Sequence, residues 1–381
     1  MTPTQHTGGL DGEAPGAGPD PEPRAGHEPG IQAGPGAGHT PEPETGPAPE
    51  PETGLEAELD AELEAELHAG FLAEAAHWLH GLFGPADRAT AAVGRILDVG
   101  SGPGVASRAL ADAFPRAQVV AVDRSATLLA RAEARAAEHG LAGRITTQRA
   151  ERPEEFARSG PVDLIWTGNV CRHLGDQQAA VRSLASALRP GGLLAVAERG
   201  LPPRFLPRDI GIGRPGLQAR LDAAVEEQVT ARRSRLPGAT SVVEDWPCLL
   251  ASAGLVPAGS RTFLIEFPAP LDVPARRHLH TRLHGLLTDL GERLDLVDRL
   301  TVEQLLDGDS CTGVLWRPDA FYLTAVTVHT ARLCRPLATS RSGSEPASEP
   351  AAPAARNRLS ENRSRKRGAE LPGAARNPRK N

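Results

Sequence analysis

The chain has 381 residues, of which 40% are hydrophobic, and its formal net charge at pH 7 is −6. This length and apolar content suffice for one large domain or two ordinary domains with a packed core. The slightly acidic composition argues against a nucleic-acid-binding protein, which usually carries a strongly basic domain or stripe.

The distribution of charge along the chain excludes one kind of catalysis. The segment before Leu55 is acidic, and Arg24 is its single Lys or Arg residue. The stretch beyond Ser340 is rich in arginine and holds both lysines of the chain, Lys366 and Lys380. The central part therefore has no lysine, which excludes Schiff-base catalysis through a protein amine.

The cysteines and the apolar runs point to a reduced protein without a membrane anchor. No stretch approaches 18 uninterrupted apolar residues, and the N-terminus is polar and proline-rich instead of resembling an export signal. The four cysteines, Cys171, Cys248, Cys311 and Cys334, are far apart and form no C-x-x-C motif. We therefore expect a cytoplasmic protein with no membrane partner and no metal site.

Both ends of the chain have a biased composition. Residues 1–54 repeat Pro, Glu, Gly and Thr in near-copies that begin at Pro41 and Pro49, and residues 338–381 consist largely of Ser, Pro, Ala and Arg. Such segments bury too little apolar surface to offset the entropy cost of ordering. We predict two disordered tails, 1–54 and 338–381, around one domain at 55–337.

A large apolar residue at every fourth position predicts a helix over residues 55–82. Leu55, Leu59, Leu63, Leu67 and Phe71 lie on one face, and Glu and Ala are interleaved with them. The polar face is acidic, whereas a helix on a membrane surface is usually basic. We therefore expect this amphipathic helix to cover the domain.

Short apolar runs alternate with helical stretches through the rest of the domain. This order implies right-handed crossovers and a mostly parallel sheet with helices on both faces. We predict a doubly wound, seven-stranded α/β fold. The expected strands are Arg95–Val99, Gln118–Asp123, Arg144–Arg149, Val162–Thr167, Gly192–Glu198, Ser260–Phe267 and Phe321–Thr330. The expected helices are Gly104–Phe114, Ser125–His139, Asp176–Leu188 and Val242–Ala253.

Two stretches rich in Arg and Leu interrupt the alternation. Residues 201–237 follow the fifth strand, and residues 271–306 separate the sixth from the seventh. Both are mostly helical in pattern. In an open α/β sheet, insertions of this kind generally lie over the carboxyl edge of the strands, where ligands bind.

A glycine-rich turn follows the first predicted strand and opens a helix. Gly100, Gly102 and Gly104 allow the backbone to approach a ligand closely. Nineteen residues past Gly104, the second strand ends at Asp123, whose carboxylate can accept two hydrogen bonds from a ribose diol. The G-x-G-x-G spacing differs from the G-x-G-x-x-G dinucleotide fingerprint. Asp98, in the preceding strand, would repel a pyrophosphate but suits the ammonium group of an amino-acid-bearing nucleoside.

Four segments in this order resemble the motifs of class I S-adenosylmethionine-dependent methyltransferases. Leu97-Asp-Val-Gly-Ser-Gly-Pro-Gly is similar to motif I, and Val120-Ala-Val-Asp-Arg-Ser to the acidic motif after it. The segments that begin at Val162 and Leu188 resemble the fourth and fifth strands of the family. The resemblance covers residues 55–337 and implies a Rossmann-like methyltransferase fold of the small-molecule type, with S-adenosylmethionine as cofactor.

The resemblance also assigns cofactor-binding residues by position. It implies that Gly100, Ser101, Gly102 and Gly104 lie along the methionyl and ribose part of the cofactor, with Asp98 near the amino group. It implies contacts of Asp123 with the ribose hydroxyls, of Arg124 with the adenine side, and of Asn169 with the region of the reactive sulfonium.

One position departs from the family pattern. The family commonly has Gly-Asp-Ala after the third strand, with the Asp bonded to the adenine amino group, whereas this chain has Gln148-Arg149-Ala150. An arginine side chain cannot accept that hydrogen bond. Either Glu151 or a backbone carbonyl replaces it, or cofactor affinity is reduced, while the Ala150 N–H remains a candidate donor to the adenine ring.

A candidate catalytic side chain follows the fourth strand. Methyl transfer requires mainly that an acceptor lone pair be held about 3 Å from the methyl carbon in a dry site. A base helps if the acceptor is a hydroxyl, and His173 is the best placed histidine. The alternative is that His173 packs against, or caps, the following helix.

We expect methyl transfer to oxygen, nitrogen or carbon of a small organic acceptor, with the two insertions forming the acceptor site. Three alternatives remain open: a methyltransferase acting on RNA or protein through the basic run that begins at Arg363, a nicotinamide-dependent oxidoreductase, and a non-catalytic relative. The absence of a Tyr-x-x-x-Lys pair speaks against the oxidoreductase. A monomer and a homodimer are equally compatible with the sequence.

Overall fold

The computed structural model describes residues 53–84, 93–151, 153–156 and 160–334. The tails predicted at 1–54 and 338–381 lie outside these residues, apart from Thr53 and Gly54, which begin the first helix. Within the described part, no helix is both long and apolar enough to cross a membrane.

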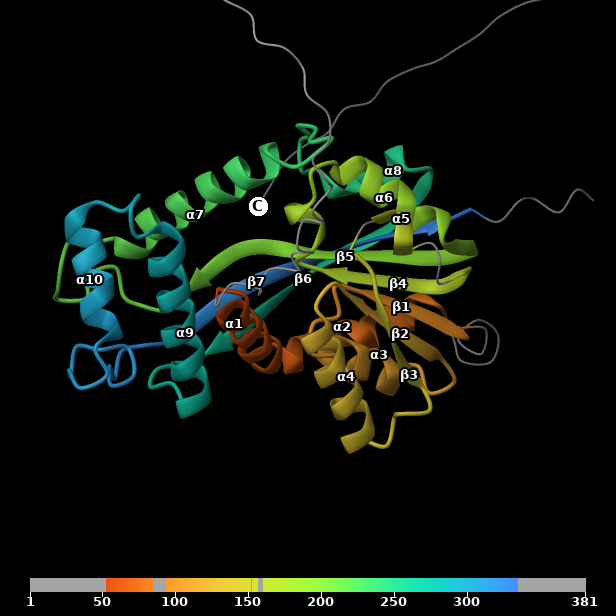
Figure 1. Ribbon diagram of the computed structural model, residues 1–381. Coiled ribbons are helices and arrows are strands. Elements are labelled where there is room, and N and C mark those ends of the chain that lie inside the picture. The colour runs from red at the N-terminus through yellow and green to blue at the C-terminus, as the bar shows by residue number, and fades with distance from the viewer. Residues whose placement is uncertain (1–52, 85–92, 152, 157–159, 335–381) are drawn as a thin grey trace, which may run out of the picture. The chain divides into compact units, whose positions relative to one another are not determined.

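The strands form one seven-stranded sheet in the order β3-β2-β1-β4-β5-β7-β6 (Figure 1). Neighbouring pairs among β1 to β5 are parallel, whereas β7 runs antiparallel to both β5 and β6. The predicted doubly wound, mostly parallel sheet is therefore confirmed. The strands are β1 Arg95–Val99, β2 Gln118–Asp123, β3 Ile145–Arg149, β4 Val162–Gly168, β5 Leu188–Arg204, β6 Leu255–Phe267 and β7 Tyr322–Leu333.

β5 extends well beyond its predicted end at Glu198. Its additional residues pair with β7, since Arg199 lies opposite Val326 and Arg204 opposite Leu323. The sequence pattern missed this extension because Leu201–Arg204 includes two prolines and alternates poorly. The first predicted insertion, 201–237, therefore begins as strand and becomes helical only at Leu217.

Helices cover both faces of the sheet (Figure 1). They are α1 Thr53–Leu67, α2 Ala69–Leu82, α3 Val105–Ala113, α4 Ala126–Glu138, α5 Pro153–Phe156, α6 Gln177–Ser186, α7 Leu217–Ser234, α8 Trp246–Ser252, α9 Val273–Leu290 and α10 Leu296–Leu306, with a 3₁₀ turn at Cys171–His173. Capping side chains determine where several of these helices begin. α8 begins four residues later than predicted because the Asp245 carboxylate accepts a hydrogen bond from the Cys248 N–H (3.1 Å).

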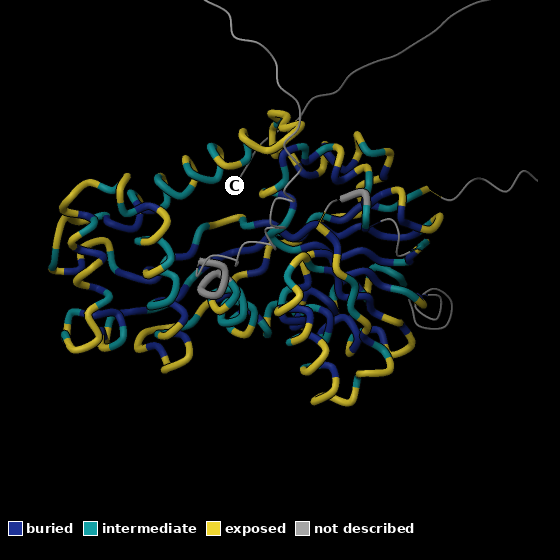
Figure 2. Tube along the Cα trace, in the orientation of Figure 1, coloured by how far each residue is buried: buried dark blue, intermediate teal, exposed yellow. Residues whose placement is uncertain are grey.

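Alternation along the strands creates two cores. In β1, Ile96 faces the core shared with α2, α3 and α9, whereas Leu97 and Val99 face the core shared with α6 and α8. β1, β2, β4 and β7 are buried along most of their length, whereas the edge strand β6 is largely exposed (Figure 2). Asp98 has the same orientation as Ile96, so the sheet holds its carboxyl group inside the first core.

The prediction of one amphipathic helix over residues 55–82 is wrong. The chain forms α1 and α2, and His68 lies between them with φ −89° and ψ 2°. α2 buries Ala75, Ala76 and Leu79, but Leu59 of α1 remains 43% exposed.

The acidic side chains of α1, which the sequence pattern places on a solvated face, make the contacts instead. One row contacts α4 from its N-cap to its last turn: Glu58 with Ser125, Glu62 with Arg131 and Glu66 with Arg135. A second row contacts the other side: Asp60 lies 3.3 Å from His278 and Glu64 lies 2.7 Å from Arg199. Because both rows repeat every four residues, each lies along one side of the helix, and charged side chains hold α1 on two sides.

We expect Leu184→Ala in α6 to lower the free energy of unfolding by about 2–5 kcal/mol, because Leu184 is fully buried and alanine leaves a cavity. Urea denaturation followed by circular dichroism measures this change. Leu296→Ala in α10 is the matched control, and because Leu296 is 59% exposed it should change the value by no more than about 0.5 kcal/mol. Equal effects of the two substitutions would contradict the assignment of this core.

Candidate functional site

The glycine-rich turn after β1 is attached to the end of β2 by three consecutive backbone N–H groups. Those of Gly100 and Ser101 donate to the Val122 carbonyl oxygen (2.8 and 3.0 Å), and that of Gly102 donates to Asp123 Oδ2 (2.9 Å). Gly100 has φ 72°, and a Cβ there would lie 2.1 Å from Val170 Cγ2. Gly102 has φ 52° and open space before it, so the turn has room for a ligand.

Asp123 fixes the turn and retains acceptor capacity. Its Oδ1 accepts from the Ser125 N–H (3.0 Å), while Oδ2 accepts from Gly102. Each carboxylate oxygen has a further lone pair. The side chain lines a cavity at the carboxyl edge of the sheet, where the remaining lone pairs are available to hydroxyl donors.

Asp98 is completely buried behind the turn. Its Oδ2 accepts a hydrogen bond from Ser107 Oγ of α3 (2.6 Å), and its Oδ1 has no partner in the structure. Burial, together with the nearby Asp123 carboxylate, raises the pKa of Asp98 to about 7. A cationic group beside Oδ1 would favour the ionised form and complete its hydrogen bonding.

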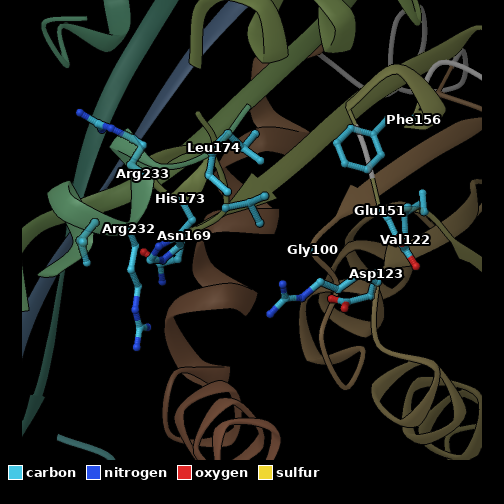
Figure 3. A pocket seen from close by; sticks show the side chains of 15 residues that line it. Gly100, Val122, Asp123, Glu151, Phe156, Asn169, His173, Leu174, Arg232 and Arg233 are labelled. Atoms are coloured by element: carbon cyan, nitrogen blue, oxygen red, sulfur yellow. The ribbon is translucent and has the colours of Figure 1, made fainter. Parts of the chain in front are cut away.

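Two cavities meet at the turn. The outer cavity, of about 530 Å³, lies between the ends of β2, β3 and β4 and helix α7, and its lining includes Asp123, Arg124, Glu151 and Asn169 (Figure 3). The inner cavity, of about 190 Å³, lies between the turn, α1, α2 and β4. Gly100 and Asn169 line both cavities, which are therefore adjacent at the turn.

Asn169 has an unusual backbone at this junction. Its φ is 56°, the one positive value outside glycine among the described residues. Its N–H donates to the Ala197 carbonyl oxygen (2.9 Å), and its Oδ1 is buried without a partner. Strained backbone and unsatisfied polar atoms concentrate at functional sites, which supports the predicted role of this residue.

The third-strand contacts differ from the prediction. The Ala150 N–H, predicted as a donor to the adenine ring, donates to the Asp123 carbonyl oxygen (3.0 Å) and is therefore occupied. Arg149 turns to the surface, where its Nε donates to the Arg124 carbonyl oxygen and its Nη2 to Glu151 Oε1 (both 3.1 Å). Glu151, which was predicted along with a backbone carbonyl as a substitute acceptor for the adenine amino group, lines the outer cavity.

His173 lies at the exposed mouth of the outer cavity, beside Asn169 and Arg232 in Figure 3. Loss of solvation on the cavity side and the guanidinium groups of Arg172 and Arg199 lower the pKa of its imidazole. The ring is therefore neutral at pH 7 and able to accept a proton. The backbone N–H of His173 donates to the Val170 carbonyl oxygen (3.0 Å) and closes the short 3₁₀ turn. Both predicted roles of the side chain, base and packing residue, remain compatible with this geometry.

The sequence pattern missed the side chains that α1, α2 and α7 bring to the cavities. His68, Glu64 and Phe71 line the inner cavity, and Arg232 and Arg233 line the outer one. The arginines within the predicted insertion 201–237 could have indicated that α7 contributes side chains to the outer cavity. For His68 there was no such signal, since its surroundings have the pattern of a continuous helix.

Comparisons with known proteins agree with this geometry. Residues 96–192 match a family model described as "Methyltransferase domain". The chain is 36% identical over 101 residues to a trans-aconitate 2-methyltransferase of Azoarcus sp., which covers 26% of this chain and 37% of that protein. It is 29% identical over 212 residues to a trans-aconitate 2-methyltransferase of Methylobacterium nodulans, covering 52% of this chain and 79% of that one. The chain thus spans well under half the length of the first of these relatives.

A solved structure, described as a putative sarcosine dimethylglycine methyltransferase from Galdieria sulphuraria, aligns with a TM-score of 0.36 and 18% identity. The alignment covers 73% of this chain and 86% of that one. The family match spans β1 to β5 and includes the glycine-rich turn and Asp123. This match, over a sheet with the order β3-β2-β1-β4-β5-β7-β6 and an antiparallel β7, assigns residues 96–192 to a methyltransferase domain.

Proposed function

We propose that this protein transfers a methyl group from S-adenosylmethionine to an oxygen, nitrogen or carbon atom of a small organic acceptor. The observation that carries the proposal is the arrangement of the glycine-rich turn and Asp123 beside two adjacent cavities at the carboxyl edge of the sheet, with Asp98 buried behind the turn. The family match over residues 96–192 supports it.

The residues present fit the cofactor. Asp123 is placed to accept from the ribose hydroxyls, and the unpartnered Asp98 Oδ1 to accept from the amino group. Glu151 lines the part of the outer cavity nearest β3, where it is available to the adenine amino group. When bound, the cofactor supplies a methyl group on a sulfonium, and the protein has to orient it and exclude water.

In this proposal, the two predicted insertions form the site for the methyl acceptor. α7, from the first insertion, lines the outer cavity, and α9, from the second, packs against α1 and α7. His173 is the candidate base if the acceptor is a hydroxyl. Trans-aconitate, which the names of two relatives specify, is the first acceptor to test.

Isothermal titration with S-adenosylhomocysteine and with NADH tests the cofactor assignment. We expect micromolar binding of S-adenosylhomocysteine and none of NADH, because Asp98 disfavours a pyrophosphate beside the turn. Tight NADH binding without S-adenosylhomocysteine binding would overturn the proposal. Transfer of a radiolabelled methyl group to trans-aconitate and to mixed small acids, phenols and amines then tests the reaction itself.

We expect Asp123→Ala to weaken S-adenosylhomocysteine binding by about 10- to 100-fold, because it removes charge-assisted hydrogen bonds and releases the Gly102 N–H. Since the lost contacts lie on the ribose side, binding of 5′-methylthioadenosine should weaken by the same factor. Asp112→Ala, in an exposed pair with Arg108, is the control and should leave both affinities unchanged. Unchanged binding in Asp123→Ala would remove this residue from the cofactor site.

We expect S-adenosylhomocysteine affinity to fall roughly 10-fold between pH 8 and pH 6. The pKa of Asp98 is about 7 in the free protein, so at pH 6 the carboxyl must lose its proton before it can pair with an ammonium group. Proton release on binding, measured by calorimetry in two buffers of different ionisation enthalpy, checks the sign. Asp98→Asn should bind more weakly and lose the pH dependence, whereas a pH-independent wild type would contradict the role of Asp98.

A further inference from the structure

Two buried polar side chains line the inner cavity, one on the glycine-rich turn and one between α1 and α2. Ser101, on the turn, is 6% exposed, and its Oγ is buried without a hydrogen-bond partner. His68, between α1 and α2, is also 6% exposed and lines the same cavity. A buried hydroxyl without a partner is costly, so Ser101 Oγ indicates that a polar ligand atom belongs here.

The tautomer of His68 follows from its neighbour Tyr322. The His68 Nε2 and Tyr322 Oη atoms are 2.9 Å apart, and Tyr322 is fully buried at the start of β7. Burial raises the pKa of the Tyr322 phenol, so its oxygen keeps its proton, for which the described residues offer no other acceptor. The phenol therefore donates to Nε2, and the hydrogen of the neutral imidazole is on Nδ1. His68 is thus a hydrogen-bond donor through Nδ1.

The charges around the inner cavity favour an anionic group. The Glu64 carboxylate on its wall is neutralised by Arg199 at 2.7 Å, a contact that holds the pKa of Glu64 well below its usual range. Helix α3 begins at Val105, directly after the turn, so the positive end of its dipole points toward the cavity. Two neutral donors and a helix N-terminus form a cradle for a carboxylate.

The position of the cavity identifies which carboxylate this is. Asp98 and Trp166 are register partners on one face of the sheet, and Trp166 lines the inner cavity. A ligand with its ribose at Asp123 and its ammonium at Asp98 therefore enters the inner cavity with the remaining substituent of the same carbon. For S-adenosylmethionine that substituent is the methionyl carboxylate.

We propose that the inner cavity binds the amino-acid end of the cofactor, and that His68 Nδ1–H and Ser101 Oγ–H donate hydrogen bonds to its carboxylate. Tyr322 is a positioning residue, which acts by keeping the hydrogen of His68 on Nδ1. This inference rests on the proposed function and adds to it His68 and Tyr322, two residues outside the segments that resemble the family motifs.

Two ligands test the proposal in the full-length protein: S-adenosylhomocysteine, and 5′-methylthioadenosine, which keeps the adenosine and sulfur but lacks the amino-acid end. We expect His68→Phe to weaken S-adenosylhomocysteine binding by about 10- to 100-fold and to leave 5′-methylthioadenosine binding within about 2-fold. His68→Asn, whose amide nitrogen lies near the position of Nδ1, should restore most of the affinity. His77→Phe on the exposed side of α2 is the matched control and should change neither affinity.

Ser101→Ala and Tyr322→Phe keep the test independent of any folding defect in His68→Phe. Ser101→Ala should weaken S-adenosylhomocysteine binding about 5- to 10-fold without affecting 5′-methylthioadenosine. Tyr322→Phe should weaken it by a smaller factor and move the imidazole hydrogen of His68 partly to Nε2, which ¹⁵N chemical shifts of the ring report. A purely structural role of Tyr322 would leave these shifts in the Nδ1–H pattern.

The outcomes separate this inference from the proposed function. If the wild type binds neither ligand, the cofactor assignment fails. Suppose that the wild type binds S-adenosylhomocysteine, but that His68→Phe and Ser101→Ala weaken the binding of both ligands equally or leave both affinities unchanged. The carboxylate site is then overturned while the proposed function stands. Equal affinity of the wild type for the two ligands would likewise exclude a contact with the amino-acid end.

Discussion

Three hydrogen bonds from the glycine-rich turn to the end of β2 are the constraint on which the site depends. They require consecutive N–H groups at residues 100 to 102 to point toward one neighbouring strand, which a chain can do only with left-handed backbone at Gly100 and Gly102. The same bonds place Asp123 at the turn and open the space in front of Gly102. The cavities, the position of Asp98 and the start of α3 all follow from this local geometry.

Unsatisfied polar atoms mark where this geometry expects a ligand. Asp98 Oδ1, Ser101 Oγ and Asn169 Oδ1 are buried without partners; Ser101 and Asn169 line the inner cavity, and Asp98 lies behind the turn. Each such atom costs about 1–3 kcal/mol when it stays unpaired. A ligand that pairs with all three recovers this free energy, so the protein is preorganised for a molecule with donors and acceptors in a fixed order along its length.

The parts of the fold governed by local rules could be predicted from the sequence. β1 and β2 have the predicted ends, because a buried apolar run followed by a glycine turn or an acidic residue is a strong local signal. The turn, Asp98 and Asp123 were predicted as site residues from the same local signals, and Asn169 from the resemblance to the family. The Ala150 N–H was assigned wrongly because its acceptor, the Asp123 carbonyl, comes from a neighbouring strand. His68 could not be found at all, since its partner Tyr322 is 254 residues away in the sequence.

The attachment of α1 has a consequence for how a ligand reaches the inner cavity. α1 forms part of the wall of this cavity, and ion pairs hold it to α4 and β5, while Leu67 near its end packs partly buried against the first core. If α1 swings away, water hydrates the released carboxylates and guanidinium groups, and little apolar surface is exposed. Opening would therefore have a small heat-capacity change, and dissolved salt would favour it by screening the charges. Such a wall can admit and release a ligand while the second hydrophobic core, to which α1 contributes no residue, stays intact.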